Sequence, residues 1–559
     1  MKKIKLLALL TATIMLLGVV MSSCSETGLG GTGGNTVTID NSKSQLYVWC
    51  VNSGYKVDWL NAAIADYETA NANKSFEEGK MGVQVIAETP KSFPGLADVA
   101  ADTTNEVYFV EHVAYRSWYN SGLFADMTKA ITSANPYDAA DAKYTSIESR
   151  LTEQQKEALN INGSYYALPH FYGNYGFIYN ADLFDEYDWY FNDQGQIIEH
   201  RTDISTTRGT GPNGISGDYD DGLPATYDQF FELCDKISGE YQMTPVAWTG
   251  SSYKAHFEGL LNCLVADYEG AENMINRLNF DGQEKLATIV DGVLKGDASA
   301  TTITEANGYE VFRQEGIYHA LTFIERLIKT DAYHNAEAQA FGNYTQIDAQ
   351  DDFIYAGKDG MTGEIAMLLD GDWWQQEASQ TFEDAKQYGT KYERNFKWMP
   401  LPKATEEKVG ENATDYDDTN GYCFIHKNTS AEKMDLAIDF VQFINSNDQL
   451  VKYTQITNTL RPIAYTMEQA DIDKLTPFGR SLYEHKMSEN FDKVFFMSSS
   501  DKFSELQIAL NNPYKAKYGS LSYGPAEAFR EASLGNIDAT AENYFTKLAE
   551  YWKQDIFRK

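Results

Sequence analysis

Hydrophobic positions along the chain change repeatedly from the pattern of a buried strand to that of an amphipathic helix. Residues 45–51 are mostly apolar, which predicts a buried strand, and residues 108–110 predict another short one. Between them, one face of a predicted helix is formed by Leu60, Ala63, Ile64 and Tyr67. Because strands alternate with helices, we expect α/β layers with parallel sheets.

Further helices are predicted where a capping residue precedes a run with helical spacing. Thr226 and Gln229 have the spacing of a capping box, and Ser430 precedes another helical run. The inward face of the first of these helices has Phe230, Leu233, Cys234 and Ile237, and that of the helix after Ser430 has Met434, Ala437, Ile438, Val441 and Ile444. A third helix is predicted between them, with an inward face of Ile317, Leu321, Ile324 and Ile328. Residues 193–222 break the pattern because they are rich in Gly, Asp, Asn and Thr, and we expect a surface insertion there.

The first 23 residues have the pattern of an export signal. Three lysines precede the uncharged apolar run 6–20, which is shorter than the about 20 residues that a membrane-spanning helix needs. Met21-Ser22-Ser23-Cys24 then resembles a bacterial lipobox, in which the Cys is lipidated and becomes the mature N-terminus; an ordinary signal peptide with a chance Cys is the alternative. We expect residues 1–23 to be a lipoprotein signal peptide. The Gly-rich residues 24–44 are then a flexible tether that anchors the exported protein to the outer face of the bacterial cell membrane.

Composition narrows the range of function classes. A chain of 559 residues with 43% hydrophobic and 13% aromatic residues can form two or three cores and is not disordered. The formal net charge of −35 repels phosphate backbones, so we expect no nucleic-acid partner. The cysteines other than Cys24 are scattered along the chain: Cys50, Cys234, Cys263 and Cys423. We expect them to be small buried hydrophobic residues, and disulfides between them are the alternative.

Enzyme signatures in the sequence are weak. Residues 28–33 fit a dinucleotide fingerprint, but no strand precedes them and they lie in the tether. The eight His residues never have the i, i+4 spacing of a helical zinc site, and residues 214–218 miss the nucleophile-elbow pattern at their last position. No carboxylate pair is singled out among the 81 acidic residues. We therefore expect that the protein is not an enzyme and that it binds no cofactor.

Two acidic turns, 218–222 and 415–421, offer oxygen ligands at alternate positions, as calcium prefers. The first lacks an oxygen ligand at its fifth position, and the second has His426 where an EF-hand loop has its bidentate Glu. We expect solvated acidic turns without metal. The less favoured calcium ligands are Asp218, Asp220, Asp415 and Asp417.

Aromatic rings in polar turns carry more information than these acidic turns. They lie in residues 52–55, 112–119, 171–174, 248–253 and 370–374, beside Asp, Asn and Ser side chains. A flat apolar face can cover the C–H side of a pyranose while carboxylates and amides bond to its hydroxyl groups. For each ring taken singly, packing in the core is the alternative.

The body of the chain resembles the extracellular solute-binding proteins of family 1, the lipoprotein subunits of bacterial carbohydrate importers of the ATP-binding-cassette (ABC) type, similar in plan to maltose-binding protein. The most specific match is residues 363–367 leading to Gly371-Asp372-Trp373-Trp374, which resembles a strand that ends in a ligand-stacking Trp. The other matching stretches are residues 121–128, 162–169, 176–180, 396–402 and 421–425, followed by the helix after Ser430.

This resemblance implies a periplasmic-binding-protein-like fold, in which two α/β lobes are joined by a three-segment hinge and close on a ligand in the cleft between them. By position, lobe 1 would hold residues 45–168 and 421–460, and lobe 2 would hold residues 169–420 and 461–559. The crossings would fall near Pro169, Gly421 and Arg461-Pro462.

The resemblance also implies ligand contacts from both lobes. Trp373 aligns with the stacking position, and Val113 stands where maltose-binding protein has a ligand-contacting acid, so maltose itself is not expected. The predicted contacts of lobe 1 are Asn52, Ser53, Tyr55, Glu111, His112 and Tyr115. Those of lobe 2 are Tyr172, Asn174, Trp248, Tyr253, Asp372, Trp373 and Trp374.

Together these features predict a monomeric lipoprotein that captures a carbohydrate, expected to be an oligosaccharide, and delivers it to the permease subunits of an ABC transporter. A starch-binding outer-membrane lipoprotein that partners a TonB-dependent porin is one alternative, but it would be almost wholly helical. A secreted glycosidase is the other.

Replacing Cys24 tests the predicted anchor. The sequence after the signal has no apolar run long enough to span a bilayer, so the lipid would be the attachment to the membrane. Cys24→Ser should therefore move the protein from the membrane fraction to the soluble fraction of fractionated cells. Unchanged membrane partitioning of the variant would contradict the lipoprotein prediction.

Overall fold

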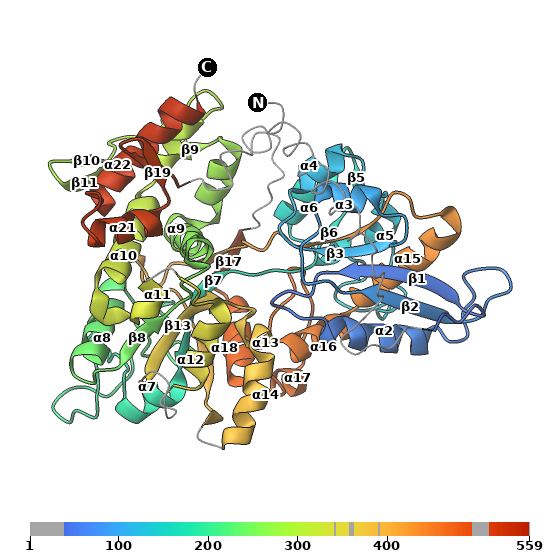
Figure 1. Cartoon of the computed structure of the whole chain (residues 1–559), viewed down its shortest axis with the longest axis horizontal. Helices are drawn as coiled ribbons and strands as arrows, with labels where there is room; N and C mark the ends of the chain where they lie inside the picture. Colours follow the sequence, from blue (N-terminus) through green and yellow to red (C-terminus); the bar gives the residue numbers. More distant parts are fainter. Residues whose placement is uncertain (1–37, 340–341, 357–362, 390–391, 495–513, 558–559) are drawn as a thin grey trace, which may run out of the picture.

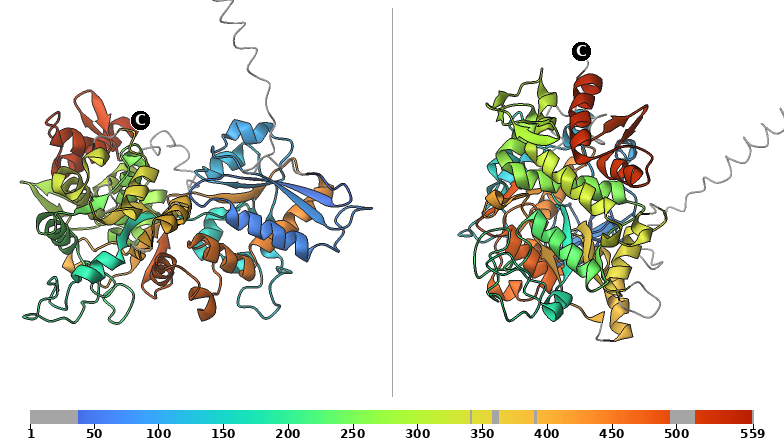
Figure 2. Two further views of the ribbon diagram at one scale, coloured as in Figure 1. Left: turned by 60° about the horizontal axis from the view of Figure 1, so that its bottom comes forward. Right: turned by 90° about the vertical axis from the view of Figure 1, so that its left-hand side faces the viewer.

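The computed structural model describes residues 38–339, 342–356, 363–389, 392–494 and 514–557. The predicted signal peptide, Cys24 and the tether up to residue 37 lie outside these ranges. Two bodies lie side by side along the longest axis, and a second view separates them equally well (Figures 1 and 2). We call the body that contains β1 lobe 1 and the other lobe 2.

Lobe 1 is built on a five-stranded sheet in the order β2-β1-β3-β16-β6. Its strands are β1 (Ser44–Cys50), β2 (Val83–Glu88), β3 (Val107–Val110), β6 (Leu168–Pro169) and β16 (Tyr422–Ile425). β1 is parallel to β2 and β3, whereas β16 is antiparallel to β3 and β6. The prediction of parallel sheets is thus correct only for the strands that alternate with helices, because β6 and β16 belong to segments that run to and from lobe 2.

Helices cover this sheet, and the early strand and helix predictions are confirmed. The strand expected at residues 45–51 is β1, and residues 108–110 lie in β3. The helix expected around Leu60 is α2, although Ile64 is only half-buried. The helices of lobe 1 are α2 (Asp58–Ala70), α3 (Leu96–Ala101), α4 (Tyr115–Asn120), α5 (Thr128–Thr132), α6 (Glu153–Leu159), α15 (Ala431–Ile444), α16 (Asn447–Thr457) and α17 (Gln469–Ile472).

Lobe 2 is built on a four-stranded sheet in the order β14-β7-β13-β8. Its strands are β7 (Tyr175–Asn180), β8 (Thr244–Ala247), β13 (Ile365–Gly371) and β14 (Phe396–Met399), with β13 parallel to β8 and β7 antiparallel to its two neighbours. The helices are α7 (Ala181–Tyr187), α8 (Tyr227–Gly239), α9 (Tyr253–Asn279), α10 (Glu315–Lys329), α11 (Ala336–Gln339), α12 (Gln346–Ile354), α13 (Trp374–Glu377), α14 (Ser379–Tyr388), α18 (Pro477–Lys486), α21 (Pro525–Ser533) and α22 (Ala541–Tyr551).

Short two-stranded ladders complete the described fold. In lobe 1, β4 (Asn160–Ile161) pairs with β5 (Ser164–Tyr165). The others are β9 (Gln283–Glu284) with β12 (Thr301–Thr302), β10 (Ala287–Val290) with β11 (Val293–Gly296), β15 (Ala413–Tyr416) with β17 (Phe491–Val494), and β18 (Ala516–Tyr518) with β19 (Leu521–Tyr523).

The two predicted helices start where the sequence places them, but their capping hydrogen bonds differ from the predicted ones. Thr226 caps α8 by accepting the Gln229 N–H, whereas the Gln229 side chain accepts from Ala225 N–H at 2.8 Å instead of completing the predicted box. Ser430 is the N-cap residue of α15, but its side chain makes no capping bond. All four residues of the predicted inner face of α10 are buried.

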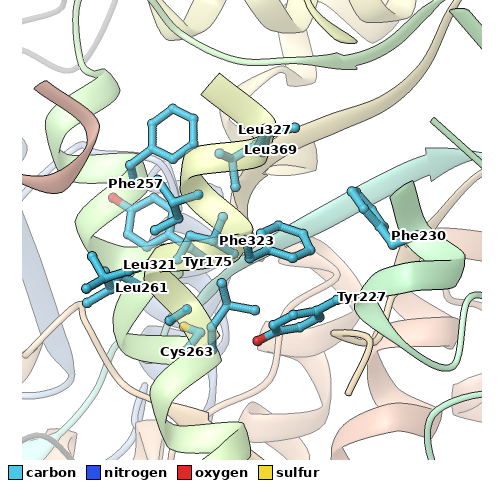
Figure 3. Packing of buried hydrophobic residues seen from close by; sticks show 14 of the residues in the cluster. Tyr175, Tyr227, Phe230, Phe257, Leu261, Cys263, Leu321, Phe323, Leu327 and Leu369 are labelled. Atoms are coloured by element: carbon cyan, nitrogen blue, oxygen red, sulfur yellow. The ribbon is translucent and has the colours of Figure 1, made fainter. Parts of the chain in front are cut away.

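The core of lobe 2 is rich in aromatic rings (Figure 3). Phe323 of α10 contacts Tyr227 and Phe230 of α8, with ring centroids 4.7 and 5.1 Å away. Tyr175, at the start of β7, lies so close to α9 that a Cβ atom on Gly259 would overlap its ring. Within the described ranges the four cysteines Cys50, Cys234, Cys263 and Cys423 are buried and unpaired, as small hydrophobes would be.

Three passages of the described chain connect the core of lobe 1 with the cores of lobe 2. The passages lie between Phe171 and Tyr175, between Tyr416 and Tyr422, and between Leu475 and Phe478. The first two are close to the predicted crossings at Pro169 and Gly421. Near the predicted crossing at Arg461-Pro462 the chain also changes cores, from Leu460 in a core of lobe 2 to Ile463 in the core of lobe 1, before the third passage after Leu475.

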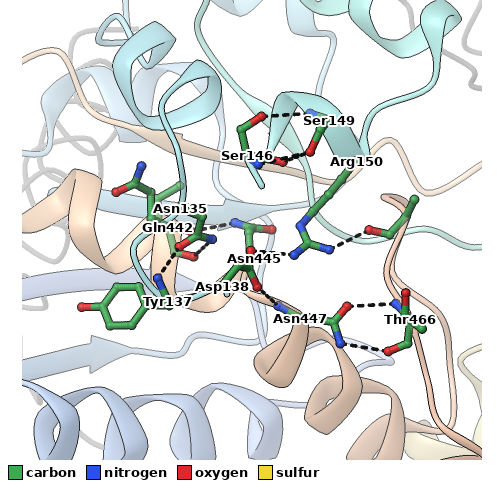
Figure 4. Close-up of polar contacts among 12 residues, drawn as sticks. Asn135, Tyr137, Asp138, Ser146, Ser149, Arg150, Gln442, Asn445, Asn447 and Thr466 are labelled. Atoms are coloured by element: carbon green, nitrogen blue, oxygen red, sulfur yellow. Dashed lines mark hydrogen bonds and ion pairs between the residues drawn. The ribbon is translucent and has the colours of Figure 1, made fainter. Parts of the chain in front are cut away.

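Polar contacts hold the segment after Arg461 on lobe 1 (Figure 4). Buried Arg150 forms an ion pair with Asp138 at 2.7 Å and donates to the Ala464 carbonyl at 3.0 Å. Asn447 exchanges two 2.9 Å hydrogen bonds with the backbone of Thr466. The apolar side chains of this segment join the lobe 1 core: Ile463, Tyr465, Met467 and Leu475.

Residues 193–222 form turns on lobe 2, without a helix or a regular strand. Isolated bridges from Phe191 to Ile197 and from Asn192 to Arg208 fold the segment back on itself. None of the helices in the described ranges has the length and apolar character needed to cross a membrane.

Substitution of Gly259 tests the tight contact between α9 and β7. Gly259→Ala should displace the Tyr175 ring and lower the free energy of unfolding by about 1–3 kcal/mol, which a thermal melt would detect. Gly239→Ala is the matched control, because Gly239 also lies in a helix but has open space where its Cβ would be. Equal melting temperatures for the two variants would contradict the assigned packing.

Candidate functional site

Trp373 lies where the two lobes touch. It follows β13 and precedes α13, and its half-buried indole packs against the core of lobe 1 as well as that of lobe 2. On the lobe 1 side, a Cβ on Gly54 would lie 2.5 Å from Trp373 Cδ1. On the lobe 2 side, a Cβ on Gly371 would overlap the far edge of the same ring. Glycine at both positions lets the indole fit between the two backbones.

Other rings surround this indole. Tyr175 meets Trp373 edge to face, with ring centroids 5.0 Å apart, and Tyr55 of lobe 1 lies 6.2 Å away. Tyr55 stacks on Phe171 at 4.9 Å, and its hydroxyl donates to the Tyr172 carbonyl at 3.0 Å. These contacts join lobe 1 to the start of β7.

A buried lysine organises the polar side of the site. Lys486, the last residue of α18, bonds to Asp372 Oδ2 and Asn174 Oδ1 at 2.8 Å each and pairs with Asp415 Oδ2 at 3.2 Å. Its Nζ also lies 3.9 Å from the centroid of the Tyr172 ring, a cation–π contact. Burial raises the pKa of Asp372 to about 6 despite the lysine. Burial opposes ionisation of Asp415 too, but Lys486 and His485 together hold its pKa well below its usual range.

A second group of carboxylates has no such partner. Burial, with Glu377 and Asp417 nearby, raises the pKa of Glu111 to about 8, although its bond from the Ser53 hydroxyl opposes the shift. Burial also raises the pKa of Asp417 to about 7 and that of Asp418 to about 6. Within the described ranges none of Glu111, Glu377, Asp417 and Asp418 forms an ion pair with a basic side chain. They are hydrogen-bond acceptors without an ion-paired partner, although Lys493 lies close enough to Asp417, and Lys56 to Glu377, to interact with them electrostatically.

We call Tyr55, Glu111, Tyr172, Asp372, Trp373, Asp417 and Lys486 the inter-lobe cluster. It combines aromatic faces, carboxylates and one ammonium group at the contact between two lobes. Such a set can hold a ligand that has an apolar face and several hydroxyl groups.

The structure brings together only part of the predicted contact set. Ser53, Tyr55, Glu111, Tyr172, Asn174, Asp372 and Trp373 lie in or beside the inter-lobe cluster. Asn52 is half-buried beside Pro90, and His112 is exposed with a left-handed backbone, φ 58°, and donates its N–H to the Thr419 carbonyl.

Four predicted contacts belong to cores instead. Trp374 is fully buried among Phe353, Phe396 and Phe478, because successive residues at a helix start point in different directions. The other three are also buried by packing: Tyr115 in lobe 1, and Trp248 and Tyr253 in lobe 2. The sequence motif Trp373-Trp374 thus contains one residue at the contact between the lobes and one core residue.

Sequence analysis did not identify the residues from distant segments that contact Trp373 and Asp372. Lys486 had no recognisable signal, and Tyr175 fell between the aromatic turn 171–174 and the matching stretch 176–180 without being named. Asp417 was noted in an acidic turn, and Asp415, also proposed there as a calcium ligand, is paired with Lys486 instead.

Comparison with known proteins shows to which family the chain belongs. The sequence profile of the family described as bacterial extracellular solute-binding protein matches residues 62–476. The chain belongs to this family. No curated protein matches its sequence significantly. Members of this extracellular family bind solutes, and the predicted family resemblance is confirmed.

Solved structures with low sequence identity show the same fold for this solute-binding protein. A structure from the thermophilic bacterium Caldanaerobius polysaccharolyticus, studied for xylan utilization, has a TM-score of 0.55 at 12% identity and covers 90% of this chain and 99% of that one. A chitin oligosaccharide binding protein has a TM-score of 0.54 at 14% identity, covering 92% and 99%. RafE in complex with raffinose has a TM-score of 0.52 at 12% identity, covering 91% and 99%. The periplasmic-binding-protein-like α/β fold is therefore confirmed.

Glu111 should make the stability of the ligand-free protein depend on pH. Its pKa is 4.5 when unperturbed and about 8 when folded, so between these values the folded state keeps a proton that the unfolded state has lost. Rising pH therefore destabilises the folded protein in this window. Thermal melts from pH 5 to 8 should show wild type losing at least about 1 kcal/mol relative to Glu111→Gln.

A matched control keeps this test specific. Glu157→Gln changes an exposed carboxylate on α6 and should leave the pH dependence as it is in wild type. Parallel pH profiles for wild type and Glu111→Gln would contradict the assigned burial of this carboxyl group.

Proposed function

We propose that this solute-binding protein captures an oligosaccharide between its two lobes and delivers it to the permease subunits of an ABC importer. In this proposal the protein is a monomer, held at the outer face of the cell membrane by a lipid on Cys24, and it returns its ligand chemically unchanged. The single observation that carries the proposal is the position of Trp373, a half-buried indole in contact with both cores.

The surroundings of Trp373 support a carbohydrate ligand. An indole face stacks well on the C–H side of a pyranose, and Tyr55 and Tyr175 supply further apolar surface beside it. Unpaired carboxylates such as Glu111 and Asp417 can accept hydrogen bonds from sugar hydroxyl groups. The names of the chitin oligosaccharide and raffinose proteins point to the same ligand class.

Contacts across the lobes support closure on the ligand. Gln376 of α13 reaches Asp58 of α2 at 3.5 Å, and Tyr55 meets Thr419 at 3.3 Å. These few side chains lie beside the passages between the lobes, so bending at the passages can separate or join the two ligand-binding faces.

Two of the sequence alternatives are less well supported. A starch-binding outer-membrane lipoprotein would be almost wholly helical, whereas each lobe here contains a sheet. Long incubation with each glycan that binds tests the second alternative, a glycosidase. We expect every bound glycan to be recovered unchanged. Release of reducing ends in proportion to the amount of protein would overturn the proposal.

A thermal-shift screen of mono- and oligosaccharides, followed by calorimetry, tests the binding function. The cognate oligosaccharide should raise the melting temperature with concentration, because it binds the folded state. Trp373→Ala should then weaken calorimetric binding by at least about tenfold, since a central aromatic contact typically contributes about 2 kcal/mol or more.

Trp374→Ala is the matched control for this test. Its cavity should cost about 3–5 kcal/mol of stability, while affinity changes little below its melting temperature. If Trp373→Ala instead melts far below wild type and binds with unchanged affinity, the indole is packing and the site is misplaced.

A further inference from the structure

The insertion of residues 193–222 contains a carboxylate cluster that the proposed function does not use. Asp218, Asp220 and Asp221 each place a carboxylate oxygen within 4.8 Å of the other two. Among the residues that the structure describes, this is the one such group of three or more His, Cys, Asp or Glu side chains.

Asp220 is the central member of this group. Its side chain is fully buried, its Oδ2 accepts the Asn213 N–H at 3.3 Å, and its Oδ1 has no hydrogen-bond partner. Asp221 likewise has a buried Oδ1 without a partner, while its Oδ2 accepts the Gly217 N–H at 2.7 Å. A buried carboxylate oxygen without a partner is costly, so a folded chain retains one only where something compensates for it.

The chain itself does not supply the compensating charge. Within the described ranges no lysine, arginine or histidine nitrogen forms an ion pair with any of the three carboxylates. The three carboxylates lie within 4.8 Å of one another, so their negative charges repel. A positive ion at the cluster would remove this repulsion.

The backbone is shaped around the same carboxylate. Gly211 has a φ of +62°, and a Cβ there would lie 2.8 Å from the carboxyl carbon of Asp220. Asn213 orients Asp218 by donating from Nδ2 to Asp218 Oδ2 at 2.7 Å. The turn therefore holds its carboxylates together, with Asp220 buried and Asp218 on the exposed side of the group.

We propose that Asp218, Asp220 and Asp221 form a calcium-binding site. Several carboxylates in an irregular turn suit calcium, which accepts six to eight oxygen ligands in flexible geometry, whereas magnesium demands a near-ideal octahedron and keeps several waters. Nitrogen or sulfur ligands, which transition metals prefer, are not among the three. At this turn the structure favours the alternative that the sequence had placed second.

The ion would fix a segment that touches the helix of Lys486. Tyr219, between two of the ligands, bonds through its hydroxyl to His485 Nδ1 at 3.0 Å, and His485 directly precedes Lys486. Pro212 accepts the Gly410 N–H at 3.0 Å, which ties the other end of the turn to the segment before β15. Calcium thus stabilises lobe 2 next to the inter-lobe cluster without taking part in it.

Calorimetric titration of the metal-stripped protein with calcium chloride tests the site, and neither readout needs a sugar ligand. Wild type should bind one calcium ion with a dissociation constant of roughly 10⁻⁶–10⁻³ M and should melt at a higher temperature as calcium is added. Asp220→Asn keeps the shape of the side chain but removes its charge, so it should weaken calcium binding at least about tenfold. Without calcium this variant should melt no lower than wild type, because the repulsion among the carboxylates falls.

Asp203→Asn is the matched control, since Asp203 is an exposed Asp of the same insertion that pairs with Arg201. It should bind calcium as wild type does. A flat titration of wild type with an unchanged melting temperature overturns the proposal, and so does calcium binding that survives in Asp220→Asn. Magnesium binding as tight as calcium binding overturns the choice of ion.

Discussion

The buried ammonium group of Lys486 is the interaction on which the site depends. It joins the end of α18 to Asn174 before β7, Asp372 after β13 and Asp415 in β15, so one cation fixes four segments of lobe 2. Removing one partner from a buried pair typically costs about 3–5 kcal/mol, because the other charge is left uncompensated. The ion pair with Lys486 therefore fixes Asp372, which directly precedes Trp373, and so limits the positions that the indole can take.

Close approach of backbone to ring is the second constraint. Gly54 belongs to lobe 1 and Gly173 to the first passage between the lobes, and a Cβ atom on either one would overlap Trp373. A rigid loop with a large ring thus meets a surface made of backbone and small residues. This arrangement brings the two lobes together without filling the contact with side chains, and it leaves polar groups such as Glu111 and Asp417 next to the indole.

Sequence patterns predicted what is local and missed what is assembled from a distance. The spacing of apolar residues identified β1, α2 and α10, because each periodic pattern lies within one segment. It could not identify Lys486, which lies over 100 residues from Asp372 and whose neighbours in the chain give no hint of a buried charge. It also could not separate Trp373 from Trp374, since only the helix start decides which ring faces the core. It gave no sign either that Arg150, far upstream, holds the segment after Arg461 on lobe 1.

The charge of the site bears on which sugars the proposed function can serve. Lys486 is already neutralised by Asp372 and Asp415, so it offers little attraction to an anionic ligand. Glu111 and Asp417 form no ion pair within the described residues, although Lys493 lies near Asp417, and their pKa values are near neutral pH, about 8 and about 7. A neutral sugar hydroxyl can donate to such a group without adding charge, whereas the carboxylate of an acidic sugar would add to a repulsion that already raises both pKa values. These buried carboxylates lower the stability of the folded protein, and they favour neutral, hydroxyl-rich ligands over acidic ones.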